Sequence, residues 1–406
     1  MDSTTTVSED IPAGCPVRVN EVIYNIAINL ALDRKRRKTH DYRSRTDNRR
    51  STSLTGAGPC IRVWLLVRPS RYSIENFQGE KVYSPYAGRN YPDQVLFGDT
   101  HFHTDLSFDA GLVGTTLGVD EGFRFARGEK VISNSGQPVQ LIRPLDFLVV
   151  TDHAEFIGLA PMIHESHAEL LADPWGNWLH ERFHSGPEGR LEAYGNIIKH
   201  GVRGENPFGS EEIARSFWVD FVEKADTYNE PGRFTAMTGF EWTSTPAGDN
   251  LHRVVIFRDG AGKTSRTLPF TMFDSPDPEG LWKYLANYED KVGGQVLAIP
   301  HNGNMSNGLM FRDTTFSGKK IDRAYTETRL RWEPIVEMTQ VKGDGETHPL
   351  LSPDDGFADY ENWDLSNLAG TAPKTKDMLQ YEYARSALKL GLKLGKRRAP
   401  ILSSLE

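Results

Sequence analysis

Two histidines separated by a single residue, His101 and His103, follow the short apolar run 95–97. Side chains alternate along a β-strand, so a His-x-His pair at the end of a strand places both rings on one face. Imidazole is a preferred ligand of zinc, iron and other transition metals. The pair therefore predicts half of a metal site.

Other histidines and acids border further apolar segments. His153 follows residues 146–150, and His301 follows residues 295–299. Independent placement would scatter such residues over helices and loops, so their recurrence at strand ends predicts one shared site. The predicted metal ligands are His101, His103, Asp109, His153, Glu241, His252 and His301.

This ligand set is suited to two or three divalent metals (zinc, manganese, iron or magnesium) that share a bridging carboxylate, for which Glu241 is the candidate. Neighbouring cations lower the pKa of a bridging water, which supplies hydroxide near neutral pH, and they bind phosphoryl oxygens. The sequence contains no nucleophile-elbow or P-loop signature. It therefore predicts a metal-dependent hydrolase of the phosphoesterase type, with Glu241 as a catalytic residue.

Residues beside the predicted ligands have possible supporting roles. Asp152 could orient an imidazole and take part in catalysis, although an Asp just before a helix is also a common N-cap. An anionic small-molecule substrate would need positive or amide groups near the site. The candidates for substrate binding are Lys342, Asn302 and Arg143.

Apolar segments and amphipathic stretches alternate along the chain. Strands are predicted at 94–97, 146–150, 234–240, 252–257, 295–299 and 335–339, and helices at 119–128, 156–183, 211–229, 278–288 and 375–394. This alternation predicts an α/β fold with a mainly parallel sheet. In a barrel of the TIM type, the polar strand ends would form the active-site face.

The 406 residues carry a net charge of −8, which argues against a nucleic-acid partner. The only cysteines, Cys15 and Cys60, provide no disulfide framework. We predict a poorly ordered basic segment at 1–60, an extended segment at 61–93, the barrel at 94–395 and a divergent tail at 396–406. Neither a signal peptide nor a transmembrane segment is recognisable, so a cytoplasmic protein without a membrane partner is expected.

The segments GDTHFHTDLS, LDFLVVTDHAEF, GFEWTS and AIPHNGN together resemble the PHP (polymerase and histidinol phosphatase) superfamily. The resemblance covers about residues 80–395 and is nearest to domain-of-unknown-function family 3604. It implies a distorted seven-stranded (βα)7 TIM-like barrel with a di- or trinuclear metal centre. By the resemblance, His101, His103, His153, His252 and His301 are ligands, Glu241 bridges the metals, and Asp109 is a further ligand or neighbour.

One departure from the superfamily pattern affects the expected activity. PHP proteins carry an Asp-x-His pair on the last barrel strand, and no such pair follows His301 here. We therefore expect a C-terminally truncated barrel that lacks its last strand and two ligands. The alternative to a hydrolase is then a truncated pseudoenzyme, or a metal-binding scaffold without activity.

A second alternative comes from the sequence His180-Glu181-x-x-His184. On a helix, this spacing places two zinc ligands on one face with a glutamate base, as in zinc proteases. Against it, Gly186 and Pro187 end the helix directly afterwards, and no third ligand has the corresponding spacing.

Overall fold

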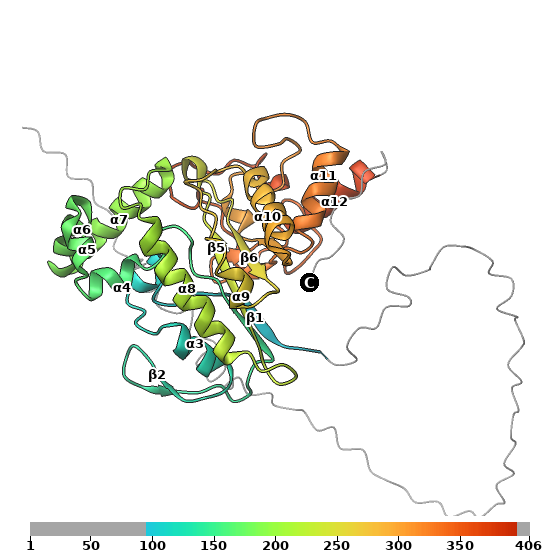
Figure 1. Cartoon of the computed structure of the whole chain (residues 1–406). Helices are drawn as coiled ribbons and strands as arrows, with labels where there is room; N and C mark the ends of the chain where they lie inside the picture. The colour runs from blue at the N-terminus through green and yellow to red at the C-terminus, as the bar shows by residue number, and fades with distance from the viewer. Residues whose placement is uncertain (1–94, 396–406) are drawn as a thin grey trace, which may run out of the picture. The chain divides into compact units, whose positions relative to one another are not determined.

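The central element is a five-stranded sheet with the order β1–β4–β5–β6–β7. The computed structural model describes residues 95–395. The segments predicted at 1–60, 61–93 and 396–406 therefore lie outside the described residues. The strands are β1 (Gly98–Phe102), β4 (Phe147–Val150), β5 (Thr235–Trp242), β6 (Arg253–Phe257) and β7 (Val296–Pro300). The sheet is curled into a half-barrel (Figure 1).

Strand direction brings the predicted ligands to one edge of this sheet. β1, β4 and β5 are parallel to one another, β6 is antiparallel to β5, and β7 is antiparallel to β6. β7 therefore runs in the direction of β1, and only β6 is reversed. The carboxyl ends of four strands and the amino end of β6 meet at the same edge.

Helices cover one side of the sheet because their apolar residues recur with helical spacing. In α8 (Glu211–Tyr228), Trp218, Phe221, Val222 and Ala225 are buried at steps of three and four residues. Trp218 lies 6.2 Å from the ring of Phe240 on β5. The sheet is further packed by α3 (Val119–Ala126), α9 (Ala261–Thr264) and α10 (Pro278–Val292), and Figure 1 shows α8 crossing in front of the strands.

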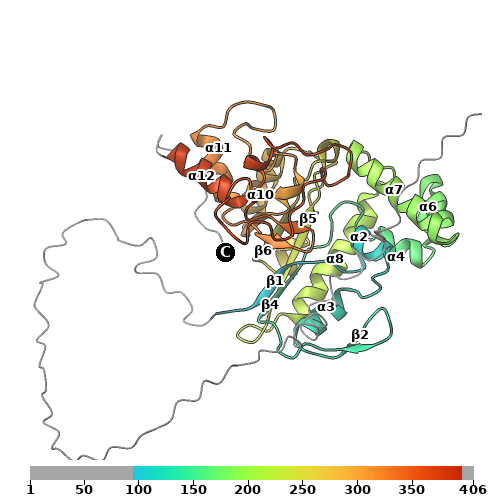
Figure 2. The same cartoon turned by 180° about the vertical axis from the view of Figure 1, so that it is seen from behind.

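The predicted helix at 156–183 is three helices in the structure. They are α4 (Leu159–His164), α5 (Ala168–Ala172) and α6 (Pro174–His184), and α7 (Pro187–Arg203) follows. Asp173 caps α6 by accepting from the Gly176 N–H, and Pro174 at its first position cannot donate to a preceding turn. With α2 (Phe108–Leu112), these helices form a second apolar cluster. Figure 2 shows α2, α4, α6 and α7 grouped beside the sheet.

The predicted strand at 335–339 does not join the sheet. The Glu337 N–H donates to the Pro300 oxygen of β7 at 3.1 Å, but the Met338 oxygen accepts from the Gly345 N–H, so Met338 bonds with the following hairpin. Within the predicted segment, only Thr339 belongs to a strand. That strand is β8 (Thr339–Gln340), which pairs with β9 (Gly343–Asp344). A further small hairpin joins β2 (Val131–Ile132) and β3 (Pro138–Val139).

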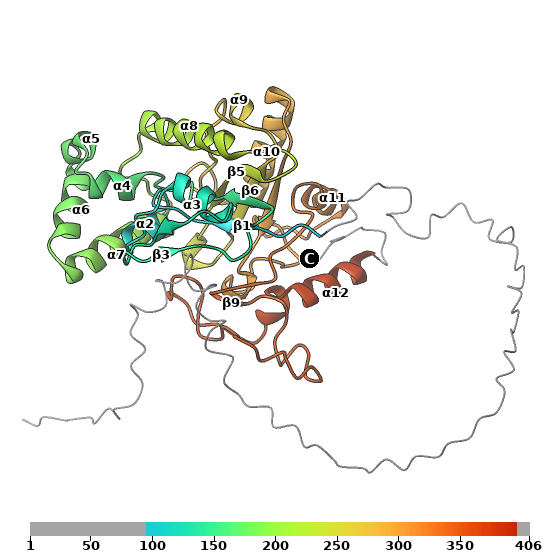
Figure 3. The same cartoon turned by 90° about the horizontal axis from the view of Figure 1, so that it is seen from below.

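The last helix is shorter than the predicted helix at 375–394. α12 spans Ala384–Gly395, after α11 (Arg323–Trp332) and the 3-10 turn Leu379–Tyr381. The segment before α12 is held instead by buried Glu382, which accepts from the Gly308 N–H and pairs with Lys374. Figure 3 shows α12 on the opposite side of the sheet from α8.

The described residues form a mixed α/β fold with an open, curled sheet rather than a closed seven-stranded barrel. Among the same residues, no helix combines the length and apolarity that crossing a bilayer requires.

Candidate metal centre

The predicted ligands converge at the edge where the strands meet. The first strand was predicted at 94–97, but residues 95–97 are exposed and β1 begins at Gly98. His101 is therefore the fourth residue of β1, and His103 follows that strand directly. His153 lies beyond β4, in an isolated parallel bridge with Glu241 of β5. His252 precedes β6 and His301 follows β7, so the reversed direction of β6 still places His252 at this edge.

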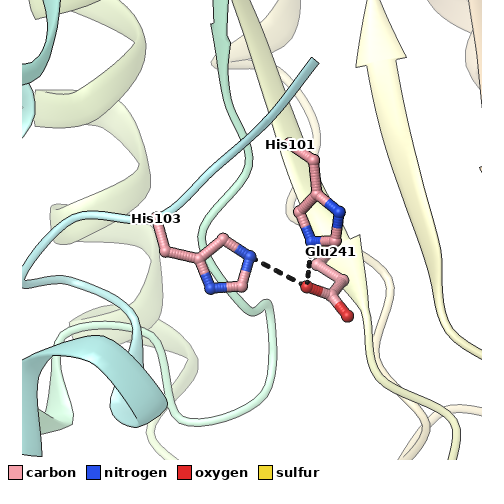
Figure 4. Close-up of side chains that lie close together, drawn as sticks. All are labelled: His101, His103 and Glu241. Carbon is pink, nitrogen blue, oxygen red and sulfur yellow. Dashed lines mark hydrogen bonds and ion pairs between the residues drawn. The ribbon is translucent and has the colours of Figure 1, made fainter. Parts of the chain in front are cut away.

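Glu241 is the centre of the cluster and is fully buried. Its Oε2 lies 3.1 Å from His101 Nε2 and 2.9 Å from His103 Nε2, and Figure 4 shows both rings directed at this oxygen. The second oxygen, Oε1, lies close to two further imidazoles. The distances are 2.7 Å to His252 Nδ1 and 2.9 Å to His301 Nε2.

Asp109, in the first turn of α2, extends the cluster on one side. Its carboxylate lies 3.1 Å from His103 Nδ1 and 3.3 Å from His153 Nε2. The Ser107 hydroxyl donates to the same carboxylate at 2.7 Å. The structure thus brings all seven predicted ligands together.

Glu337 extends the cluster on the other side and is absent from the predicted ligands. Its Oε2 lies 2.8 Å from His101 Nδ1. The backbone bond to Pro300 places this carboxylate between the ends of β7 and β1. The signal in the sequence was an acidic residue inside the apolar segment 335–339, which a search for an Asp-x-His pair passes over.

Four overlapping groups of three side chains could each hold a metal ion, with ligand atoms within 4.8 Å of one another. They are His101, His103, Glu241; His101, His301, Glu337; His103, Asp109, His153; and His153, Glu241, His252. Imidazole nitrogens and carboxylate oxygens are suited to zinc, manganese and iron. The donor atoms present therefore fit divalent metal ions, and Glu241 belongs to two of the four groups.

The carboxylates of the cluster favour positive charge beside them. Burial by itself lowers the pKa of His101, but the nearby charges of Glu337 and Glu241 outweigh it and raise this pKa to about 9. Burial opposes ionisation of Glu337, yet its contact with His101 lowers the pKa of Glu337 to about 2. Burial lowers the pKa of His252 to about 3, which keeps that imidazole neutral and able to bind a metal.

Hydroxyl groups fix the orientation of two imidazoles. The Thr243 hydroxyl lies 2.5 Å from His153 Nδ1, and the Thr245 hydroxyl lies 2.9 Å from His252 Nε2. Such contacts set the tautomer and ring orientation of a metal ligand. Asp152 instead accepts from the Thr104 N–H and hydroxyl, so it anchors the loop after His103.

The three predicted substrate residues lie in different places. Lys342 is in the turn between β8 and β9, and its backbone oxygen accepts from Asn304 in the loop after His301. Asn302 follows His301 with a φ of 51°, and both atoms of its buried amide make no hydrogen bond within residues 95–395. Arg143 is not brought to the centre, since its guanidinium lies over Phe97, before the start of β1.

The histidines of the predicted protease motif are partnered elsewhere. His180 Nε2 lies 2.8 Å from the Ser166 hydroxyl, and His184 Nε2 lies 3.1 Å from the Ile163 oxygen. The three-ligand groups found within the described part of the chain do not include this pair. A helical HExxH spacing is therefore present without a third ligand in that part.

Comparison with known proteins gives one match. A family model described as "Protein of unknown function (DUF3604)" matches residues 90–399, which include every residue of the cluster. No curated protein and no solved structure matches the chain.

Proposed function

Since the chain belongs to the DUF3604 family of proteins of unknown function, we propose its activity from its own side chains: a metal-dependent hydrolase of phosphoesters. We further propose that its half-barrel is a variant of the PHP barrel. The curled sheet and the ligands at the carboxyl ends of parallel strands support that relation.

The contacts of Glu241 support the proposal most directly. A fully buried carboxylate whose two oxygens each lie within 3.1 Å of two imidazoles is suited to bridge cations. When bound, divalent cations lower the pKa of a coordinated water and neutralise charge on phosphoryl oxygens. The chain itself supplies ligand orientation through Thr243 and Thr245, which hold the rings of His153 and His252.

Substrate recognition is the second part of the proposal. The buried amide of Asn302, which makes no hydrogen bond within the described residues, would donate to a substrate oxygen. The Lys342 backbone oxygen accepts from Asn304 in the loop after His301, and the ammonium of Lys342 would balance negative charge on a phosphoester.

The test combines metal analysis with an assay on p-nitrophenyl phosphate. We expect the purified protein to bind two or three equivalents of zinc or manganese and to hydrolyse the ester. His101→Ala should reduce the rate by about 100-fold or more, since its ring contacts both Glu241 and Glu337. His167→Ala is the matched control, because His167 is exposed and lies outside the cluster.

Two outcomes would contradict the proposal. Bound metal with no hydrolysis of any phosphoester would identify a metal-binding scaffold instead. Absence of metal after reconstitution, with His101→Ala indistinguishable from the parent chain, would reject the metal centre itself.

A further inference from the structure

A cavity of about 350 Å³ begins one residue after His153. Its walls are residues 154–162, the loop and first turn of α8 at 206–214, and the loop 268–274. This volume is in the range of sites that hold small organic molecules. None of the metal ligands lines the cavity, so it is separate from the cluster around Glu241.

The lining combines aromatic side chains with polar ones, and it favours an uncharged ligand. Phe156, Phe208 and Phe273 contribute aromatic surface, and the rings of Phe156 and Phe273 meet edge to face at 5.3 Å. No Lys or Arg lines the cavity, and its two carboxylates are exposed and already partnered. Glu211 accepts from Arg215, and Asp274 accepts from the Thr271 hydroxyl. An anion would have to shed its hydration without gaining a cationic partner, which is unfavourable.

The backbone at the cavity wall is held in an unusual conformation. Phe156 has a φ of 59°, a region that bulky side chains rarely adopt. The neighbouring Glu155 is buried and accepts from the Thr243 N–H at 3.0 Å and the Met272 N–H at 2.6 Å. Strain of this kind persists where surrounding contacts enforce it, and it is concentrated at ligand sites.

The same contacts connect the cavity with the metal cluster. Thr243, which donates its N–H to Glu155, also has its hydroxyl 2.5 Å from His153 Nδ1. The ring of Phe108 lies 6.0 Å from Phe156 and 4.8 Å from His153. Thr243 and Phe108 therefore contact both the residues at the cavity wall and the predicted metal ligand His153.

We infer that this cavity binds an uncharged group that carries an aromatic ring. The group has two possible sources with the same chemistry, namely one end of the molecule that reacts at the metal cluster or a separate small molecule. The inference concerns binding and does not depend on the proposed hydrolysis.

The first experiment compares two probes that differ in charge, benzyl alcohol and benzoate, by ligand-observed NMR on the full chain. Benzyl alcohol should bind about tenfold more tightly than benzoate, which is about 1.4 kcal/mol. Ala214→Trp should abolish this binding, because Ala214 lines the cavity. Ser216→Trp places the same side chain on the exposed face of α8 and should leave binding unchanged.

A second variant guards against misfolding of Ala214→Trp. Phe208 is only partly buried, so Phe208→Ala should keep the native circular dichroism spectrum. The same variant should bind benzyl alcohol several-fold more weakly than the parent chain. Equal binding of both probes, or undiminished binding in both cavity variants, would overturn the inference.

A third measurement distinguishes the two sources. In the metal-loaded protein, competitive inhibition of p-nitrophenyl phosphate hydrolysis by benzyl alcohol would identify the cavity as part of the substrate site. Binding without an effect on KM would identify a site for a separate molecule. The NMR experiment measures binding and not activity. Its result can therefore be interpreted even if the proposed hydrolysis is not observed.

Discussion

At the residue scale, Glu337 gives the clearest prediction, because its carboxylate contacts His101 from a segment that does not belong to the sheet. Glu337→Gln removes the negative charge and keeps the shape. We expect affinity for zinc or manganese to fall by about 10–100-fold, as for other groups that orient metal ligands. A chelator-competition titration measures this change.

The matched control is Glu165→Gln, which neutralises an exposed glutamate outside the cluster. Metal affinity of the control should equal that of the parent chain. If Glu337→Gln also retained full affinity, Glu337 would have no part in metal binding.

Buried Glu382 makes stability depend on pH. Burial raises the pKa of Glu382 from 4.5 to about 7, although Lys374 partly opposes the shift. The folded state thus disfavours the ionised carboxyl, so this group reduces stability as pH rises from about 4.5 to about 7. The loss is at most roughly 3 kcal/mol, by the usual 1.36 kcal/mol per unit of pKa.

Urea unfolding of the parent chain and of Glu382→Gln, at pH 5 and pH 8, measures this effect. The variant should lose less stability than the parent between these two pH values. A parent and a variant with the same pH dependence would show that Glu382 ionises normally.

At the scale of elements, Glu333 joins α11, α10 and β6. Its buried carboxylate accepts from Arg253 at 3.0 Å, Trp282 at 2.8 Å and Arg329 at 3.0 Å. Glu333→Gln leaves the buried Arg253 without its charge partner, so we expect the free energy of unfolding to fall by about 3–5 kcal/mol.

The same substitution on the surface of α11 is the control for chemical denaturation. Glu327 pairs with Arg323, but both side chains are about half exposed or more. Glu327→Gln should change stability by less than about 1 kcal/mol. Comparable losses in the two variants would mean that the buried network does not hold these elements together.

Elements whose pattern was local were predicted well, and those set by tertiary contacts were not. α8 and α10 lie close to their predicted bounds because capping residues and apolar spacing agree. Residues 375–383 of the predicted helix at 375–394 do not belong to α12. There, Glu382 and the preceding Lys374 bond with the loop after β7. No local pattern of residues indicates that contact.

At the scale of the whole molecule, metal removal should loosen the described fold, because the ligands come from all five strands and from residue 337. A ligand at 100 times its Kd stabilises the folded state by about 2.7 kcal/mol. Treatment with EDTA should therefore lower the Tm by roughly 5 °C or more, measured by calorimetry.

Glu241→Gln provides the comparison for this measurement. The variant should melt near the Tm of the EDTA-treated parent and respond little to EDTA itself. An identical Tm with and without EDTA in the parent chain would contradict a metal centre that spans the sheet.

Residue type and strand position were enough to identify six members of the cluster, because the carboxyl ends of β1, β4, β5 and β7 and the amino end of β6 meet at one edge. The seventh, Asp109, lies in α2 and not at a strand end. The sequence by itself thus determined the α/β class, the helices α3, α8 and α10, and the chemistry of the ligands. Only the tertiary structure decided that the described sheet is an open half-barrel and that Glu337 reaches His101. The Glu337–His101 contact joins residues 236 positions apart. The sheet depends on pairings such as Phe147 with Thr235, 88 positions apart, and no local periodicity encodes either contact.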